Sequence, residues 1–131
     1  MKNDLFFMKR AYEQALLGFN KEEIPVGAVV VYENKIISEA HNESISKTDP
    51  TSHAEIEAIR DAALKIGNYR LTDAIMYVTL EPCLMCCGAL IHARFDKVIF
   101  STKPGRNTSY NYYFPFFSTN LTSKLYWVKR R

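Results

Sequence analysis

The sequence contains no uninterrupted apolar run long enough for a secretory signal peptide or a membrane-spanning helix. Cysteine is also scarce: there are three in 131 residues, an odd number, and two of them are spaced as metal ligands are. A disulfide framework is therefore not expected, and a chain of this length can bury a core without one. We expect a single domain, residues 1–131, in the reducing environment of the cytoplasm and without membrane association.

Acidic side chains are absent from residues 97–131, which carry seven basic side chains and so a formal charge of +7. The first 96 residues carry −4, from ten basic and fourteen acidic side chains. The basic segment also holds nine aromatic side chains, between Phe100 and Trp127. Cations that track phosphates and rings that stack on bases are typical of single-strand nucleic-acid binding. The alternative is that these aromatics complete the core and a subunit interface.

Hydrophobic periodicity predicts helices that alternate with strands. The expected helices are 5–19, about 53–66 and about 83–93, and the expected strands are 26–31, 35–38, 75–80, 97–100 and, less regularly, 125–128. The first helix is expected to pack on the core through apolar residues at helical spacing, namely Phe6, Met8, Ala11, Tyr12, Ala15, Leu16 and Phe19. Such alternation implies an α/β sheet with helices on its faces.

Two short segments carry the residues that suggest chemistry. The first is His53-Ala54-Glu55, and the second is Pro82-Cys83-Leu84-Met85-Cys86, directly after a predicted strand. Cysteines three apart on a helix share one face, and a helix N-terminus, which Pro82 suits, favours thiolates. Two thiolates and one imidazole make a three-ligand zinc site with an open position, which is the catalytic pattern. H-x-E followed by P-C-x-x-C is the signature of zinc nucleobase deaminases.

Glu55 also has a plainer interpretation. Thr51 or Ser52 is expected to cap the helix, and Ser52-x-x-Glu55 fits a capping box, in which Glu55 would only stabilise the helix start. Residues two apart on a regular helix do not face one another. His53 and Glu55 can therefore serve one site only if His53 lies at the helix entry, where the backbone is not yet regular. With the cysteines downstream, we predict Glu55 as the catalytic proton carrier.

Cys87 is the main ambiguity in the metal assignment. It lies four residues after Cys83, near the same helix face, and could supply a thiolate. We prefer Cys83 and Cys86, because the C-x-x-C spacing recurs in zinc sites. Cys87 is then expected to pack as a small hydrophobic side chain.

Four segments closely resemble bacterial tRNA-specific adenosine deaminases, within the cytidine deaminase-like superfamily. They are PVGAVV at 25–30, DPTSHAEI at 49–56, NYRL at 68–71 and YVTLEPCLMC at 77–86. The resemblance implies a three-layer α/β/α sandwich with a mixed central sheet. It implies one Zn²⁺ per chain, on His53, Cys83 and Cys86, with Glu55 as proton shuttle. It also implies a homodimer whose active sites lie near the subunit interface.

The same resemblance implies deamination of adenosine to inosine at the wobble position of a tRNA anticodon, with Asn42 in contact with the nucleoside. Ile24, Leu80 and Ala54 are expected beside Asn42 in the substrate-binding walls. The resemblance ends after Phe100. There the family usually has a Gly/Ala-rich stretch that includes an acidic residue, whereas residues 101–107 of this chain have a different sequence, and residues 102–131 diverge from the family.

The identity of the substrate therefore has alternatives. The chain could deaminate single-stranded DNA, or a free base or nucleoside such as guanine, cytosine or cytidine. A third possibility, from another class, is a catalytically silent zinc module that binds RNA or a partner deaminase subunit. A fourth is a truncated family member that folds poorly. The presence of Glu55 disfavours the silent module, which has no use for a proton carrier.

Overall fold

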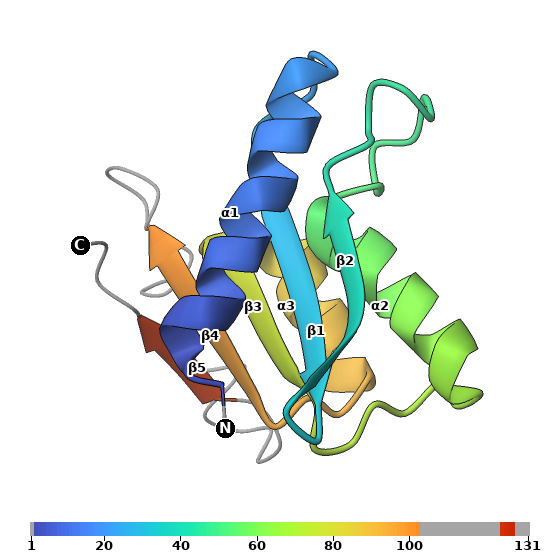
Figure 1. Ribbon diagram of the computed structural model, residues 1–131. Helices are drawn as coiled ribbons and strands as arrows, with labels where there is room; N and C mark the ends of the chain where they lie inside the picture. The colour runs from blue at the N-terminus through green and yellow to red at the C-terminus, as the bar shows by residue number, and fades with distance from the viewer. Residues whose placement is uncertain (1, 103–123, 128–131) are drawn as a thin grey trace.

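The computed structural model describes residues 2–102 and 124–127 (Figure 1). The elements in chain order are α1 (Asp4–Asn20), β1 (Gly27–Tyr32), β2 (Lys35–His41), α2 (Ala54–Ile66), β3 (Ile75–Leu80), α3 (Leu84–His92), β4 (Lys97–Thr102) and β5 (Lys124–Trp127). All the helices and strands predicted from periodicity are present, with ends that differ by a few residues.

The strands form one five-stranded sheet in the order β2-β1-β3-β4-β5. β1 is antiparallel to β2 and β3, whereas β3, β4 and β5 are parallel, so the sheet is mixed as predicted. Residues 27–31 of β1 and 76–79 of β3 are buried without alternation. Such continuous burial is typical of strands that are covered on both faces.

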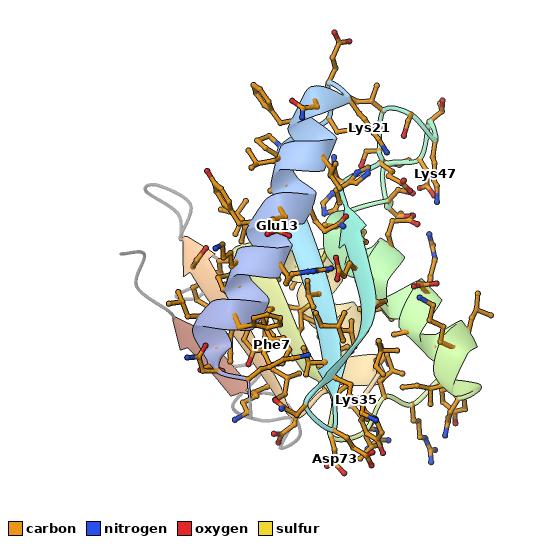
Figure 2. The ribbon with its side chains drawn as sticks, in the orientation of Figure 1. Phe7, Glu13, Lys21, Lys35, Lys47 and Asp73 are labelled. Atoms are coloured by element: carbon orange, nitrogen blue, oxygen red, sulfur yellow. The ribbon has the colours of Figure 1, made fainter. Side chains whose placement is uncertain are left out.

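Helices cover both faces of the sheet, which confirms the three-layer arrangement (Figure 1). α1 lies over one face, where Phe7 contributes to a cluster with Tyr77 and Ile99 (Figure 2). α2 and α3 lie on the other face and share a second, larger cluster with the sheet. The two core layers are therefore separate, and only the one under α2 and α3 adjoins the predicted metal ligands.

The face of α1 that packs on the sheet agrees with the predicted one at Met8, Ala11 and Ala15 and differs from it elsewhere. Its buried residues are Phe7, Met8, Ala11, Ala15 and Gly18. Four side chains that were expected in the core are 39–63% exposed, namely Phe6, Tyr12, Leu16 and Phe19. Apolar residues occur on both sides of this helix, so periodicity alone could not select the side that faces the sheet.

The close approach of Gly27 to α1 selects that side. A β-carbon on Gly27 would lie 1.8 Å from the backbone oxygen of Ala11 and 2.6 Å from the backbone nitrogen of Ala15. The N–H of Gly27 donates to the hydroxyl of Thr79 at 3.1 Å. Only small residues fit on the helix at this crossing, and the crossing fixes the segment before β1 next to the end of β3.

The start of α2 corrects the predicted cap. The N-cap is His53 rather than Thr51 or Ser52, and its side chain makes no capping hydrogen bond. Glu55 is then the second residue of the helix, one position short of the place that a capping box requires. The end of α2 agrees with the prediction, because Gly67 follows it in the left-handed conformation with φ 75°.

Most of the basic, aromatic segment at 97–131 lies outside the described residues. The nucleic-acid contacts expected of that segment therefore stay a prediction. Within the described part of the chain, no helix combines the length and the apolar character that crossing a bilayer requires.

The Gly27 crossing yields a stability prediction with a matched control. Gly27→Ala should lower the free energy of unfolding by about 1–3 kcal/mol or more, because the new methyl group meets backbone that cannot move aside locally. Gly88 lies within α3, and a β-carbon there would meet nothing within 4 Å. Gly88→Ala should therefore raise stability by about 0.5–1 kcal/mol. Urea denaturation of both variants checks this, and equal effects would contradict the close crossing.

Candidate active site

The N-termini of α2 and α3 meet at the predicted metal site. His53 is the N-cap of α2 and Cys83 is the N-cap of α3, and both have extended backbone. His53 therefore lies at the irregular helix entry that a shared site with Glu55 requires. Helix α3 begins at Leu84, one residue later than predicted, so Cys86 is its third residue. The side chains of an N-cap and of the third helical residue reach toward each other, which explains how the two cysteines converge.

The geometry of these three side chains fits a zinc ion. Nδ1 of His53 lies 3.6 Å from Sγ of Cys83 and 3.6 Å from Sγ of Cys86. The three ligand atoms all lie within 4.8 Å of one another. Tetrahedral zinc, with its usual bond lengths to sulfur and nitrogen, sets its ligand sulfur and nitrogen about 3.6 Å apart. The distances from the imidazole to both sulfurs therefore fit Zn²⁺ held by these three side chains, with a fourth position open.

The electrostatics of the two cysteines also favour a bound cation. A hydrogen bond from the Cys86 thiol lowers the pKa of Cys83 to about 5, with His53 assisting and burial opposing. The Cys83 thiolate and burial in turn raise the pKa of Cys86 above its ordinary value. The negative charge of one thiolate therefore disfavours ionisation of the second cysteine. A positive ion bound between the two sulfurs removes this repulsion.

Glu55 is a buried carboxyl group beside this cluster. Its side chain is 4% exposed. Burial, with a smaller contribution from the neighbouring Cys83 thiolate, raises its pKa to about 7. A carboxyl group that exchanges its proton near neutral pH is suited to general acid–base chemistry. Because Glu55 is not part of the three-residue ligand cluster, it is free to carry a proton there.

A cavity of about 200 Å³ opens next to the ligands. Its walls contain every predicted substrate-binding residue together with three of the predicted catalytic and metal-binding ones: Ile24, Asn42, Ala54, Leu80, His53, Glu55 and Cys83. Cys86 does not line this cavity and lies fully buried behind it. The cavity thus brings together residues that are up to 59 positions apart in the sequence, from Ile24 to Cys83. The volume is small beside the usual drug-sized pocket, and it suits one planar base.

Two further wall residues, Val26 and Glu81, were not predicted. Val26 lies in PVGAVV at 25–30, one of the four segments that carry the resemblance, but it was given no role there. Glu81 is 3% exposed. Its place in YVTLEPCLMC at 77–86, between a buried strand and Pro82, is the signal that could have indicated it. A larger hollow of about 470 Å³ adjoins the cavity and shares Ile24, Val26 and Leu80 with it. The exposed apolar side of α1 forms the far wall of this hollow.

Cys87 takes the packing position that was predicted for it. It is 1% exposed and belongs to the core cluster under α2 and α3. Its thiol donates to the backbone oxygen of Pro82 at 3.6 Å, and burial raises its pKa to about 12. A neutral thiol that points into the core is a poor zinc ligand.

Comparison with known proteins supports this description. Residues 1–102 match the family model of the cytidine and deoxycytidylate deaminase zinc-binding region. The chain is 48% identical over 101 residues to a tRNA-specific adenosine deaminase of Buchnera aphidicola subsp. Baizongia pistaciae. That match covers 77% of this chain and 62% of the relative, so the chain spans less than two thirds of the relative's length.

Two solved structures are similar across most of the chain. One comes from a study of A-to-I editing by tRNA:A34 deaminases at the wobble position of transfer RNA. It has a TM-score of 0.85 and 32% identity, and the match covers 95% of this chain and 91% of that one. The other is guanine deaminase from Bacillus subtilis, with a TM-score of 0.78, 39% identity, and coverage of 85% of this chain and 75% of that one.

Replacing Cys86 and Cys87 separately tests the ligand assignment. Cys86→Ala should lose zinc, because it removes one of the three atoms in the cluster. Cys87→Ala should keep one zinc per chain and lose only roughly 1 kcal/mol of stability from deletion of a small buried group. Metal analysis and thermal melting of the two variants measure both effects. Retention of zinc by Cys86→Ala together with its loss from Cys87→Ala would contradict the assignment.

Proposed function

The chain belongs to the cytidine and deoxycytidylate deaminase family, and on that basis we propose that it is a zinc-dependent hydrolytic deaminase that converts adenosine to inosine in RNA. The preferred substrate is the wobble adenosine of a tRNA anticodon. The observation that carries this proposal is the site itself: three ligand atoms for zinc and a buried carboxyl group at one small cavity. The 48% identity to a tRNA-specific adenosine deaminase supports the choice of base and of polymer.

His53, Cys83 and Cys86 are the residues that would hold the zinc ion. Bound zinc lowers the pKa of water to about 7, which makes hydroxide available at neutral pH. The N-termini of α2 and α3 add positive potential on the same side, which favours the thiolates in this position.

Glu55 would carry the protons of the reaction. Its carboxylate accepts the proton of the attacking water and delivers it to the ring nitrogen next to the attacked carbon. The carboxylate then takes the proton of the new hydroxyl group on that carbon and gives it to the amine. The C–N bond breaks as the C=O bond forms, so that ammonia leaves and inosine remains. Burial of Glu55 at 4% exposure keeps bulk water from competing for these protons.

The cavity walls would hold the base in place. Leu80 and Val26 offer apolar surface to its faces, whereas Asn42 is a polar wall group that can hydrogen-bond to the nucleoside. Asn42 is 4% exposed, so a hydrogen bond from it to the ligand would be shielded from water. Such shielding increases the preference for ligands that hydrogen-bond to the Asn42 amide over ligands that leave it unpaired.

A free purine base is the second candidate substrate. The 39% identity to guanine deaminase from Bacillus subtilis favours it, at a TM-score of 0.78. The zinc ligands and the proton carrier would serve either substrate equally, so the choice depends on the walls and on residues outside the described part of the chain. We further propose a homodimer and a cytoplasmic location, the latter supported by three free cysteines.

Replacement of Glu55 tests the proton-carrier role. Glu55→Gln keeps the size of the side chain but cannot carry a proton, so turnover should fall by about a hundred- to ten-thousand-fold. Zinc content and melting temperature should stay near those of the parent. Glu57→Gln is a matched control from the same helical turn, where Glu57 pairs with Lys47 at 2.8 Å, and it should keep turnover. Loss of stability with an unchanged rate in Glu55→Gln would indicate a purely structural role.

Competition between substrates tests the proposed function. Ammonia release should be measured with three probes: an anticodon stem–loop RNA that carries adenosine at the wobble position, the same loop with cytidine there, and free guanine. We expect the adenosine loop to give the highest kcat/KM. Preferential turnover of guanine would establish the second candidate, and no turnover of any probe by the zinc-loaded protein would contradict both.

A further inference from the structure

A third buried acid, Glu23, lies behind the cavity wall and was not predicted from the sequence. It follows the end of α1 and is 5% exposed. Its N–H donates to the backbone oxygen of Gly18 at 2.9 Å, which fixes it against the helix. The end of α1 and the loop between β2 and α2 lie together at one end of the molecule (Figure 1), near the labelled Lys21 and Lys47 (Figure 2). Glu23 bridges them.

The carboxylate of Glu23 accepts three hydrogen bonds from that loop. Oε2 accepts from the backbone N–H of Ser46 at 2.7 Å, and Oε1 accepts from that of Ile45 at 3.1 Å. Oε1 also accepts from Nδ2 of Asn42 at 3.5 Å, the longest of the three contacts. Burial raises the pKa of Glu23, but the hydrogen bonds from Ser46 and Ile45 outweigh it and hold the pKa below its ordinary value. Glu23 is therefore an anion at neutral pH.

An ionised carboxylate accepts hydrogen bonds and cannot donate them. The Asn42 amide must therefore turn its NH₂ group toward Glu23 and its oxygen away. The oxygen, Oδ1, accepts from the hydroxyl of Ser44 at 3.3 Å, which agrees with this orientation. The backbone of Asn42 is held as well, because its N–H donates to the oxygen of Val26 at 3.2 Å. An amide oxygen has two acceptor sites, so one remains for a ligand in the cavity that Asn42 lines.

We propose that Glu23 is a positioning residue for the deamination site, which fixes the Asn42 amide so that its oxygen accepts a hydrogen bond from the substrate. This inference rests on the proposed function, in which Asn42 contacts the nucleoside. A role confined to holding the loop would need only the two backbone N–H groups. The third contact, to the side chain of Asn42 in the cavity wall, lets Glu23 influence which substrate binds. A substrate with a hydroxyl or amino donor facing the Asn42 oxygen is favoured, and one with an acceptor at the same place is disfavoured.

The test is a double-mutant cycle between Glu23 and Asn42. Glu23→Gln keeps the shape of the side chain but can donate as well as accept, so the Asn42 amide is no longer forced into one orientation. We expect kcat/KM for the adenosine stem–loop RNA to fall roughly tenfold, the order of one lost hydrogen bond, with zinc content unchanged. In the Asn42→Ala background, the same Glu23→Gln change should have no further effect on kcat/KM.

Asp49→Asn provides the matched control. Asp49 holds the other end of the same loop, where it accepts from the N–H of Thr51 at 2.8 Å and from its hydroxyl at 2.7 Å. Any effect of Asp49→Asn should multiply with that of Asn42→Ala, because Asp49 acts on the loop and not on the amide. Independent, multiplicative effects of Glu23→Gln and Asn42→Ala would overturn the positioning role.

Two further measurements separate this inference from the proposed function. Affinity for purine riboside, which is adenosine without its amino group, can be measured in the same cycle without turnover. Coupling between Glu23 and Asn42 in binding, with no turnover of RNA, would reject the RNA substrate and retain the positioning role. The side-chain NH₂ resonances of Asn42 in the ligand-free, zinc-loaded protein should shift in Glu23→Gln and not in Asp49→Asn. Unshifted resonances in Glu23→Gln would overturn the inference without reference to any substrate.

Discussion

The two helices α2 and α3 pack against the same face of the sheet, and this packing brings their N-termini together. α2 faces the sheet with Ala54, Ala58 and Ala62, all fully buried. Small side chains four residues apart let a helix lie close to the strands beneath it. α3 packs in the same cluster through Cys87 and Leu90. The site depends on this arrangement, because His53 and Cys83 are the residues that immediately precede the two helices.

The meeting of two helix N-termini creates a local excess of positive potential. The chain places two thiols and two acids there, Glu55 and Glu81, all of them at least partly buried. Without a cation, the Cys83 thiolate would raise the pKa of both Cys86 and Glu55. The electrostatic pattern and the ligand distances thus support the same ion, which is stronger support for zinc than the spacing of the cysteines alone.

The opposite wall of the cavity comes from a different part of the fold. The crossing of Gly27 under α1 fixes the segment before β1, which supplies Ile24 and Val26. The loop after β2 supplies Asn42, and Glu23 ties that loop back to the end of α1. The side of the site with the candidate metal ligands is therefore built by helix starts. The opposite wall of the cavity is built by loops whose side chains need further hydrogen bonds to hold one orientation.

The sequence alone determined the order of helices and strands and identified the three candidate zinc ligands, because both are recorded in short-range patterns. A left-handed Gly67 ends a helix, and C-x-x-C marks two thiols on one helix end, whatever lies around them. It could not determine which face of α1 packs inward, since Phe6 and Phe7 are equally apolar and only the crossing at Gly27 distinguishes them. It also could not show that Glu55 is buried at the second position of α2, or that Glu23 contacts Asn42 across 19 residues. Those features depend on distances between elements remote in sequence, which only the packed tertiary structure sets.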